Sequence, residues 1–286
     1  MAKIGTNEKN IIWAYDELQN ILDIQIRSAE SLFGVDRNGQ PELSLERAAA
    51  RLYQGQINDS VLTKCYRNQR EVLVTAHALG FGLYSAQIVQ MLESIKHWED
   101  VGYEHISGEY KIGSRIKLKR PNKNSPVSLS VVALPIIECF EARDIREEVD
   151  WVATAAASFV QQGLLPHHIM IVVLDDRNAQ TYLRAISSRL NERQIATNNL
   201  LADRYSDPAF WIDDMVTLST VYRAKGNEAP LVIVTGIDSI NGRVRRDRNK
   251  IFTAFAVRHG FGYRELDRLH RSSSTRLRLL GAVCRT

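Results

Sequence analysis

The sequence predicts an α/β protein built around doubly wound parallel sheets. Two runs, "HIMIVVLDD" and "APLVIVTGID", are apolar throughout instead of alternating, which is typical of strands covered on both faces. The run "AQTYLRAISSRLNERQ" has the periodicity of an amphipathic helix, and "MVTLSTVY" indicates a further strand. Strand, helix, strand and strand at these spacings indicate a parallel sheet with helices on its faces.

Helical and hairpin patterns precede this region. Residues 43–53 have a helical pattern, and so do residues 70–95, with an interruption at Gly80 and Gly82. Residues 107–132 alternate polar and apolar side chains around a turn of Pro, Asn, Ser and Lys, which predicts a β-hairpin or a linker between domains.

A second regular unit begins near residue 138. The run "DIREEVDWVATAAASFVQQG" has apolar residues at helical spacing and ends at Gly163, a residue type that favours a helix stop. The strands and the helix described first follow this element along the chain. The unit therefore contains most of the predicted parallel sheet.

Composition sets broad limits on the class of protein. The 286 residues, 44% of them hydrophobic, are enough for one large domain or two ordinary ones. No stretch approaches the roughly 18 uncharged apolar residues of a membrane span, and the start "MAKIGTNEKN" lacks the apolar core of a secretory signal. We therefore expect a cytoplasmic protein with no membrane partner. The three cysteines are far apart and in no C-x-x-C spacing, so we expect reduced thiols and no structural zinc.

Four short stretches carry the candidate chemistry. "NIIWAY", residues 10–15, predicts a buried strand that ends at Asp16 and Glu17, and ligands of open parallel sheets bind at that end. Such a pair often only caps a helix. It also suits nucleotide hydrolysis, because Asp holds Mg²⁺ through water while Glu deprotonates the attacking water. The other stretches are "KCYRNQREV", "TVYRAKGNEAPLVIV" and "RNKIFTAF", in this order along the chain.

In these stretches the chain resembles the UvrD/Rep-like superfamily 1 helicases, which are ATP-driven motors. In that family, D-E-x-Q follows a hydrophobic strand, motif IV contains Y-R, motif V is close to T-x-H-x-x-K-G-x-E, and motif VI ends in T-R. The resemblance extends from Asp16 to Phe255. It implies two RecA-like domains of the P-loop NTPase type, the first incomplete and the second nearly complete, with ATP and Mg²⁺ as cofactors.

The resemblance assigns nucleotide contacts residue by residue. Asp16 would coordinate Mg²⁺, Glu17 would be the general base, and Gln19 would sense the γ-phosphate. Tyr66 would stack on the adenine. Arg67 would reach the γ-phosphate, whose oxygens suit the planar guanidinium. Taken singly, Arg67 also fits a surface ion pair, and Tyr66 also fits a core aromatic.

Motif V supplies the nucleic-acid contacts that the resemblance implies. Thr220, Lys225 and Gly226 lie where the family contacts the phosphates of single-stranded nucleic acid, either DNA or RNA. Glu228 matches the acid near the ribose, although alone it also fits the start of a helix. Tyr222 replaces the usual histidine.

The chain also departs from the family pattern. It contains no G-x-x-x-x-G-K-[ST] loop to hold the β- and γ-phosphates and no motif III of the form G-D-x-x-Q. The arginine-finger position is Val257, and Arg258 follows one residue later, on a different face if this segment is a helix. We expect the chain alone to be inactive as an ATPase.

The segment 256–286 differs from the rest of the chain. It has seven arginines, no lysine and two acidic residues, a net charge of +5 against −1 elsewhere. It also lacks the apolar strand expected to close the second sheet. A shifted reading frame near residue 256 explains both the lost motif and the composition, whereas a basic nucleic-acid-binding tail explains only the composition. We therefore expect a poorly packed tail and an unpaired sheet edge.

These observations predict four segments. Residues 1–60 would be a remnant of a first RecA-like domain, and residues 61–137 a connecting helical region with a hairpin. Residues 138–255 would form a second RecA-like domain, and residues 256–286 an Arg-rich tail. We interpret the chain as the C-terminal part of an ATP-dependent DNA helicase. Its expected partners are single-stranded DNA or RNA and a separate chain that carries the missing N-terminal part. Two alternatives stay open: a non-catalytic module that binds nucleic acid or protein, and a decayed reading frame.

Two further features have simpler interpretations. Asp175 and Asp176 follow a predicted strand and fit a loop or a helix cap better than a catalytic pair. His77, in "TAHALGFG", fits a packed or capping histidine better than a nucleic-acid contact.

Overall fold

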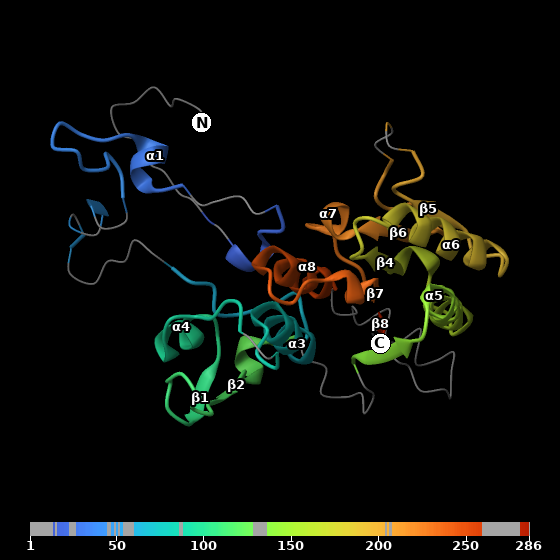
Figure 1. Cartoon of the computed structure of the whole chain (residues 1–286), viewed down its shortest axis with the longest axis horizontal. Helices are drawn as coiled ribbons and strands as arrows, with labels where there is room; N and C mark the ends of the chain where they lie inside the picture. Colours follow the sequence, from blue (N-terminus) through green and yellow to red (C-terminus); the bar gives the residue numbers. More distant parts are fainter. Residues whose placement is uncertain are drawn as a thin grey trace.

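The computed structural model describes residues 14, 16–22, 27–44, 47–48, 50, 52–53, 60–85, 88–127, 136–203, 205, 208–258 and 281–285. For Glu17 and residues 281–285 it describes the backbone. The chain forms a larger unit around a sheet and a smaller unit of helices and a hairpin, which meet where α3 lies along α8 (Figure 1).

The larger unit contains a six-stranded sheet in which all neighbouring strands are parallel, in the order β3-β8-β7-β4-β6-β5. The strands are β3 (Glu138–Ala142), β4 (Ile169–Val173), β5 (Thr197–Asn199), β6 (Val216–Thr220), β7 (Leu231–Thr235) and β8 (Gly281–Arg285). The prediction of a parallel α/β sheet is confirmed. The strands β4 and β7, which occupy the middle of the sheet, are the two runs that are apolar throughout.

Helices cover both faces of the sheet. On one face, α5 (Ile145–Gln161) and α6 (Ala179–Asn191) pack on Ile169, Ile171 and Val173 of β4. On the other face, α7 (Val221–Ala224) and α8 (Arg245–Ala256) pack on Met170 and Val172. Each residue of β4 is therefore buried, which explains why the strand has no polar alternation.

The sequence signals that end these helices act as expected. The carboxylate of Asp144 accepts hydrogen bonds from the backbone N–H groups of Arg146 and Glu147 at 2.8 and 2.9 Å, and so caps the start of α5. Gly163, with φ of 96°, turns the chain back after the helix. The prediction of the helix and its glycine stop is confirmed.

The smaller unit contains α3 (Arg70–Phe81), α4 (Ile95–Asp100) and a hairpin of β1 (Glu104–Ser107) and β2 (Lys117–Lys119). Its core is an aromatic cluster of Phe81, Trp98 and Tyr103. The buried guanidinium of Arg120 connects several segments of the unit. It donates hydrogen bonds to the carbonyl oxygens of Thr63, Val101 and Asn124 and to the hydroxyl of Ser125. The remaining short helices are η1 (Glu17–Gln19), α1 (Ala29–Phe33), η2 (Asn122–Asn124), η3 (Pro166–His168) and η4 (Ile237–Ser239).

Several predicted boundaries are wrong. The interruption predicted at Gly82 in the helical region 70–95 is confirmed, because α3 ends at Phe81 and Gly82 takes the left-handed conformation that stops a helix. The continuation of the helix directly after it is wrong, since α4 begins only at Ile95. The hairpin turns within residues 108–116, and the Pro and Asn segment forms η2. The chain after Thr220 turns into α7 instead of continuing as a strand. Of the helix predicted for 43–53, residues 45, 46, 49 and 51 lie outside the described residues, 47 and 48 are helical, and 43, 44, 50, 52 and 53 are not.

The expectation of an unpaired sheet edge and a tail without a closing strand is also wrong. Residues 281–285 form β8, which pairs in parallel with both β3 and β7. At the start of the tail, Val257 and Arg258 are buried to 2% and 0% exposure. The sequence hid β8 because its five residues, "GAVCR", include Gly and Arg and have only three consecutive apolar residues, fewer than a buried strand usually shows.

The strand predicted before Asp16 lies mostly outside the described residues. Ala14 and Asp16, which are described, are exposed and belong to no strand, and Glu17 to Gln19 form the 3-10 helix η1. For the described residues, the expectation of a buried strand that ends at Asp16 is therefore wrong. Within the described part of the chain, no helix is long and apolar enough to cross a membrane.

Candidate functional site

Two residues that the sequence assigned to different motifs form an ion pair. The guanidinium Nε of Arg67 donates a hydrogen bond to Oε1 of Glu228, and both side chains are about one-third exposed, at 33% and 34%. Tyr66, next to Arg67, exposes 65% of its surface. The expected adenine-stacking residue is therefore open to solvent beside the ion pair, and the alternative of a core aromatic is wrong for Tyr66.

The residues after Arg67 fix this segment to the end of α8. The side-chain amide of Asn68 donates hydrogen bonds to the carbonyl oxygens of Ala256 and Arg258, at 3.1 and 2.5 Å. The guanidinium of Arg258 donates one to Oε1 of Gln69 at 2.7 Å. The sequence "RNQ" thus joins the start of α3 to the last turn of the motif VI helix.

The two residues at the expected arginine-finger position face inward. Val257 packs in the apolar cluster between α8 and the sheet. The Arg258 side chain is buried as well, and loss of hydration lowers the pKa of its guanidinium to about 10, with the charge of Glu71 acting the other way. Arg258 is therefore a packing and hydrogen-bonding residue at this position.

The carboxylate of Asp16 is engaged within its own turn. It accepts hydrogen bonds from the Leu18 N–H at 3.1 Å and from the Gln19 side-chain amide at 2.8 Å. The Lys225 amine donates a hydrogen bond to the Gln19 carbonyl at 2.8 Å. The contact between Gln19 and Lys225 joins the acidic stretch to motif V.

A second contact fixes η1 on α8. The side-chain amide of Asn249 donates a hydrogen bond to the Asn20 carbonyl at 3.0 Å, and Ile21 is buried. Within the described residues, no hydrogen bond or ion pair joins Asp16 to Tyr66 or Arg67. The structure therefore brings the motif residues together as two pairs, Arg67 with Glu228 and Gln19 with Lys225. The resemblance implies that all of them line one nucleotide cleft, and this stays a prediction.

The motif V residues lie at the carboxyl end of β6. Thr220 is the last residue of the strand and is largely buried, whereas Lys225 is exposed. Gly226 has φ of 88°, and a Cβ atom there would meet no other atom within 4 Å. The glycine is needed for the backbone turn alone, and the space in front of it is open.

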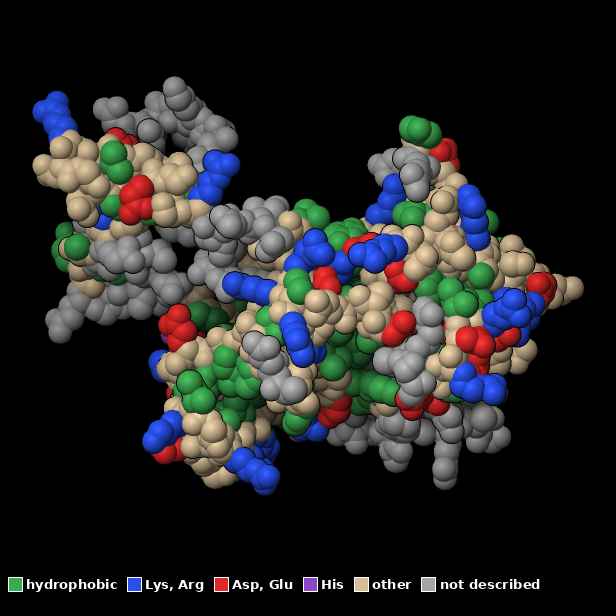
Figure 2. Space-filling model, viewed as in Figure 1, with side chains coloured by type: hydrophobic (Ala, Val, Ile, Leu, Met, Phe, Trp, Pro, Cys, Tyr) green, Lys and Arg blue, Asp and Glu red, His purple; other side chains and the backbone are tan. Residues whose placement is uncertain are grey.

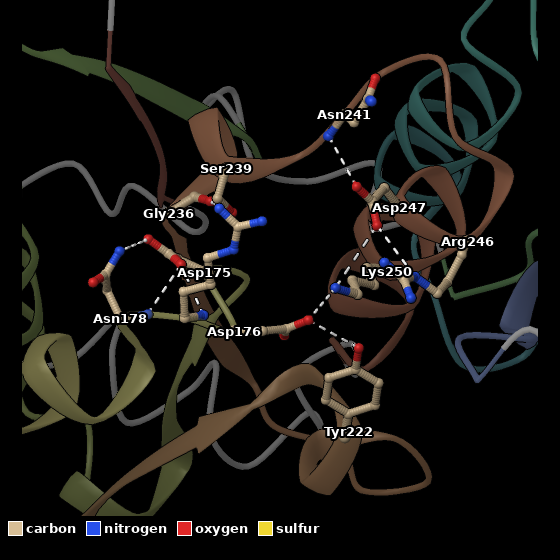
Figure 3. Close-up of polar contacts among 11 residues, drawn as sticks. Asp175, Asp176, Asn178, Tyr222, Gly236, Ser239, Asn241, Arg246, Asp247 and Lys250 are labelled. Carbon is tan, nitrogen blue, oxygen red and sulfur yellow. Dashed lines mark hydrogen bonds and ion pairs between the residues drawn. The ribbon is translucent and has the colours of Figure 1, made fainter.

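Sequence reasoning missed a buried lysine at the same edge of the sheet. The Lys250 amine, on a side chain that is 5% exposed, donates to the carboxylate of Asp176 and lies 3.8 Å from that of Asp247 (Figure 3). It also lies 5.4 Å from the centre of the Tyr222 ring, and the Tyr222 hydroxyl donates to Asp176 at 3.0 Å. Asp176 thus links elements that follow β4, β6 and β7.

The environment of Lys250 keeps it charged. Burial, the largest single influence, disfavours the ammonium form, but the hydrogen bonds to Asp176 and Tyr222 and the charge of Asp176 outweigh it and raise the pKa of Lys250. Asp176 follows a predicted strand and was noticed for that reason. Its partner lies 74 residues further on, and nothing in the local sequence indicates the pairing.

Asp175 orders the loop that leads into α6, which confirms its interpretation as a loop residue. Its carboxylate accepts hydrogen bonds from the backbone N–H groups of Arg177 and Asn178, at 3.0 and 3.1 Å, and from the Asn178 amide (Figure 3). Gly236, which follows the neighbouring strand β7, packs against it with φ of 72°. After β4 the chain continues to a helix on one face of the sheet, and after the neighbouring strand β7 it continues to a helix on the other face. Open parallel sheets bind ligands at the carboxyl ends of two strands related in this way, and the contact between Asp175 and Gly236 lies there.

His77 is packed, as expected. Its ring is in contact with the rings of Phe81, Tyr103 and Phe252, and Nδ1 lies 2.9 Å from the Tyr103 hydroxyl. Burial, aided by the charge of Arg120, lowers the pKa of His77 to about 3. The histidine is therefore neutral at physiological pH.

A groove of the described residues lies away from the motif residues. An open polar groove of about 590 Å³ lies between α6 and β5, and it is lined by Arg184, Ser187, Ser188, Asn191, Ala196, Thr197, Asn199 and Ala202. None of the motif residues lines it. Among the described side chains, no three His, Cys, Asp or Glu residues converge as metal ligands, and Cys65 and Cys139 are free thiols.

Comparison with known proteins adds no family assignment. A scan against models of protein families and a search of curated proteins both found no match to this chain.

Proposed function

We propose that the chain carries motor elements of the superfamily 1 helicase type, which couple ATP to movement on single-stranded nucleic acid. The observation that carries the proposal is the ion pair between Arg67 and Glu228. These two residues were assigned to motifs IV and V from the sequence alone, and 161 residues separate them. A chance occurrence of short motifs predicts no contact between them. The parallel sheet with helices on both faces is compatible with the RecA-like fold that the proposal requires.

The nucleotide-contacting residues fit an adenine nucleotide in part. Tyr66 offers an exposed ring for stacking on a base, and the Arg67 guanidinium is partly exposed and polarised by a single carboxylate. A phosphate that approaches Arg67 would compete with Glu228 for the same N–H groups. The ion pair therefore holds the arginine in place until a nucleotide binds.

The described residues do not form a Mg²⁺ site. The Asp16 carboxylate is engaged by two hydrogen bonds within its own turn, and among the described side chains no three His, Cys, Asp or Glu residues converge to hold a metal ion. We therefore derive no hydrolytic step. The residues of the chain support nucleotide contact through Tyr66 and Arg67. The hydrogen bonds of Asn68 and Gln69 would couple nucleotide binding at these residues to α8.

A nucleic-acid strand would contact motif V. The Lys225 amine is exposed and bound to a single carbonyl oxygen, that of Gln19, so it can exchange that partner for a phosphate at small cost. The open space at Gly226 admits a sugar–phosphate chain close to the backbone. Because Gln19 belongs to the acidic stretch, strand binding at Lys225 would release η1 from motif V.

Binding of a fluorescent ATP analogue tests the proposal. We expect the analogue to bind the chain, and we expect Arg67→Ala and Tyr66→Ala each to weaken binding by about tenfold, as for loss of one charge-assisted contact or one stacked base. Tyr205→Ala, at a fully exposed tyrosine remote from the motifs, is the matched control. Equal affinity of all four proteins, or no binding, contradicts the proposed nucleotide contact.

A further inference from the structure

We propose that the turn after α3 and the loop before α8 form a second contact for single-stranded nucleic acid. The contact consists of the Tyr84 ring and the side chains of Arg243, Arg245 and Arg246, and we call it the Tyr84–arginine surface. It rests on the proposed function, because it adds to the contact assigned to Lys225. No motif of the sequence includes these residues.

The two segments are joined through one buried arginine. Arg248, on α8, donates hydrogen bonds to the carbonyl oxygens of Gly242 at 2.8 Å and Leu79 at 3.1 Å, and also to the Ser85 hydroxyl. Tyr84 and Arg243 are thus each one residue away from a group bound by the same guanidinium. The ring and the arginines therefore lie on neighbouring segments of the surface.

Two glycines make room for this arginine. A Cβ atom at Gly82 would lie 3.2 Å from the Arg248 guanidinium carbon, and one at Gly242 would lie 2.8 Å from a guanidinium nitrogen. Gly82 also takes φ of 74°, which lets the chain turn directly after α3. The separation of the two segments is therefore fixed by packing.

The loop that carries the arginines is ordered by its own hydrogen bonds. The Asn241 N–H donates to the Asp247 carboxylate at 3.0 Å (Figure 3). The Arg243 N–H donates to the Asn241 side chain at 3.0 Å. Residues 241–248 hold four arginines and one acidic residue. The backbone is thus fixed while Arg243, Arg245 and Arg246 are exposed to solvent.

The positive charge of this loop does not stabilise α8. Arg245 and Arg246 are in the first turn of the helix, where the macrodipole favours acidic side chains over basic ones. Arg246 has one long contact, 3.5 Å from the Asp247 carboxylate. Figure 2 shows Lys and Arg side chains, with some acidic ones, over the region where α7 and α8 lie in Figure 1. An arrangement that disfavours the isolated helix indicates an anionic partner.

The exposed aromatic ring identifies the class of partner. Tyr84 exposes 93% of its surface, beside the arginine loop. Aromatic rings next to guanidinium groups are the means by which proteins hold single strands, because each base has a face for stacking and each phosphate binds a guanidinium. In a duplex the base faces are already stacked on one another, so the ring favours a single strand.

Fluorescence anisotropy with a labelled oligo(dT) of about 20 nucleotides, longer than one site of about 4–16 nucleotides, tests this inference. The full chain is titrated without ATP at about 50 mM and about 200 mM salt. We expect the variant Arg243→Ala, Arg245→Ala, Arg246→Ala to bind at least about tenfold more weakly at the lower salt. The slope of log affinity against log salt should decrease by about 2, since each phosphate contact contributes about 0.7.

Three controls separate charge, stacking and folding. Arg37→Ala, Lys111→Ala, Arg115→Ala removes the same charge from exposed positions elsewhere and should leave the slope unchanged. Tyr84→Ala should weaken binding about tenfold with little change of slope, whereas Tyr205→Ala should have no effect. Replacing the three loop arginines by lysine keeps the charge, and it should keep the slope if the loop contacts phosphates.

The outcomes for Lys225→Ala distinguish this inference from the proposed function. If Lys225→Ala weakens binding and neither the loop variant nor Tyr84→Ala does, the second contact is wrong and the motif V contact stands. If the loop variant and Tyr84→Ala weaken binding and Lys225→Ala does not, the second contact stands and the motif V contact fails. A wild-type chain that does not bind the oligonucleotide overturns both.

Discussion

The guanidinium of Arg67 is paired with the carboxylate of Glu228, across 161 residues of sequence. The pair joins the segment before α3 to the segment before β7, and the neighbouring Asn68 and Gln69 extend the joint to the end of α8. Elements of the smaller unit and of the sheet unit therefore meet at one surface.

The ion pair between Arg67 and Glu228 should show measurable coupling. A double-mutant cycle with Arg67→Ala and Glu228→Ala, followed by urea unfolding, should give a coupling free energy of about 1 kcal/mol, at the upper end for partly exposed pairs. The pair of Arg143 and Glu147, in which the arginine is 86% exposed, is the control and should give a smaller coupling, because solvent screens it more strongly. Equal coupling in both pairs would show that the joint is an ordinary surface contact.

Stability should depend on pH through His77. Its folded-state pKa is about 3, below its ordinary value of 6.5, so between these values the unfolded chain takes up a proton that the folded chain does not. The free energy of unfolding should therefore be greatest above pH 6.5 and should fall with falling pH, by at most about 1.4 kcal/mol per pH unit from this residue.

Comparison with His77→Phe isolates the histidine. The variant keeps an aromatic ring among Phe81 and Phe252, and it should show a flatter pH dependence between about pH 5 and 6.5, above the range where carboxylates titrate. Parallel curves for the two proteins in this window would contradict the assignment of a buried, neutral histidine.

Gly236 should tolerate no side chain. Its φ is 72°, and a Cβ atom would lie 3.1 Å from the backbone nitrogen and from Cβ of Asp175. Gly236→Ala should therefore destabilise the fold by about 1–3 kcal/mol. Gly113→Ala has a similar φ of 85° but nothing within 4 Å, so it should cost about 1 kcal/mol or less. A larger loss at Gly113, measured by thermal unfolding, would refute the packing of β4 and β7 at this point.

The chain alone should have no appreciable ATPase activity. Its sequence has no G-x-x-x-x-G-K-[ST] loop, and Val257, at the arginine-finger position, is buried. Absence of an arginine finger alone slows phosphoryl transfer by roughly 10³-fold or more. A steady-state assay with Mg²⁺ and single-stranded DNA checks this expectation. Turnover near about 1 s⁻¹ that Glu17→Gln abolishes would contradict it.

Much of the sheet unit was predictable from the sequence because its signals are local. The apolar runs of β4 and β7 and the periodicity of α5 and α6 each indicate one element, and the structure confirms them. β3 and β5 lie at the sheet edges and have mixed polarity, and β8 has only three consecutive apolar residues, so pattern alone did not indicate them. Tertiary pairing with neighbouring strands defines these elements.

The candidate site was predictable only to the level of residue types. The motifs identified Arg67 and Glu228 one at a time, but they did not indicate how close the two side chains lie in the fold. Nothing in the local sequence indicates the contact between Lys250 and Asp176. The same is true of the packing of Gly82 and Gly242 against Arg248. Each contact depends on how α8 lies against the other elements. Such contacts require the fold.

In the proposed binding mode, an adenine nucleotide contacts the chain at Tyr66. Photo-crosslinking with 8-azido-ATP, followed by mass spectrometry of the peptides, tests this most directly, because the reactive group is on the base that would stack on the ring. We predict an adduct within residues 64–70 that excess ATP suppresses and that Tyr66→Ala removes, whereas Tyr205→Ala leaves it unchanged. An adduct confined to other peptides, or one that ATP does not suppress, would contradict the account.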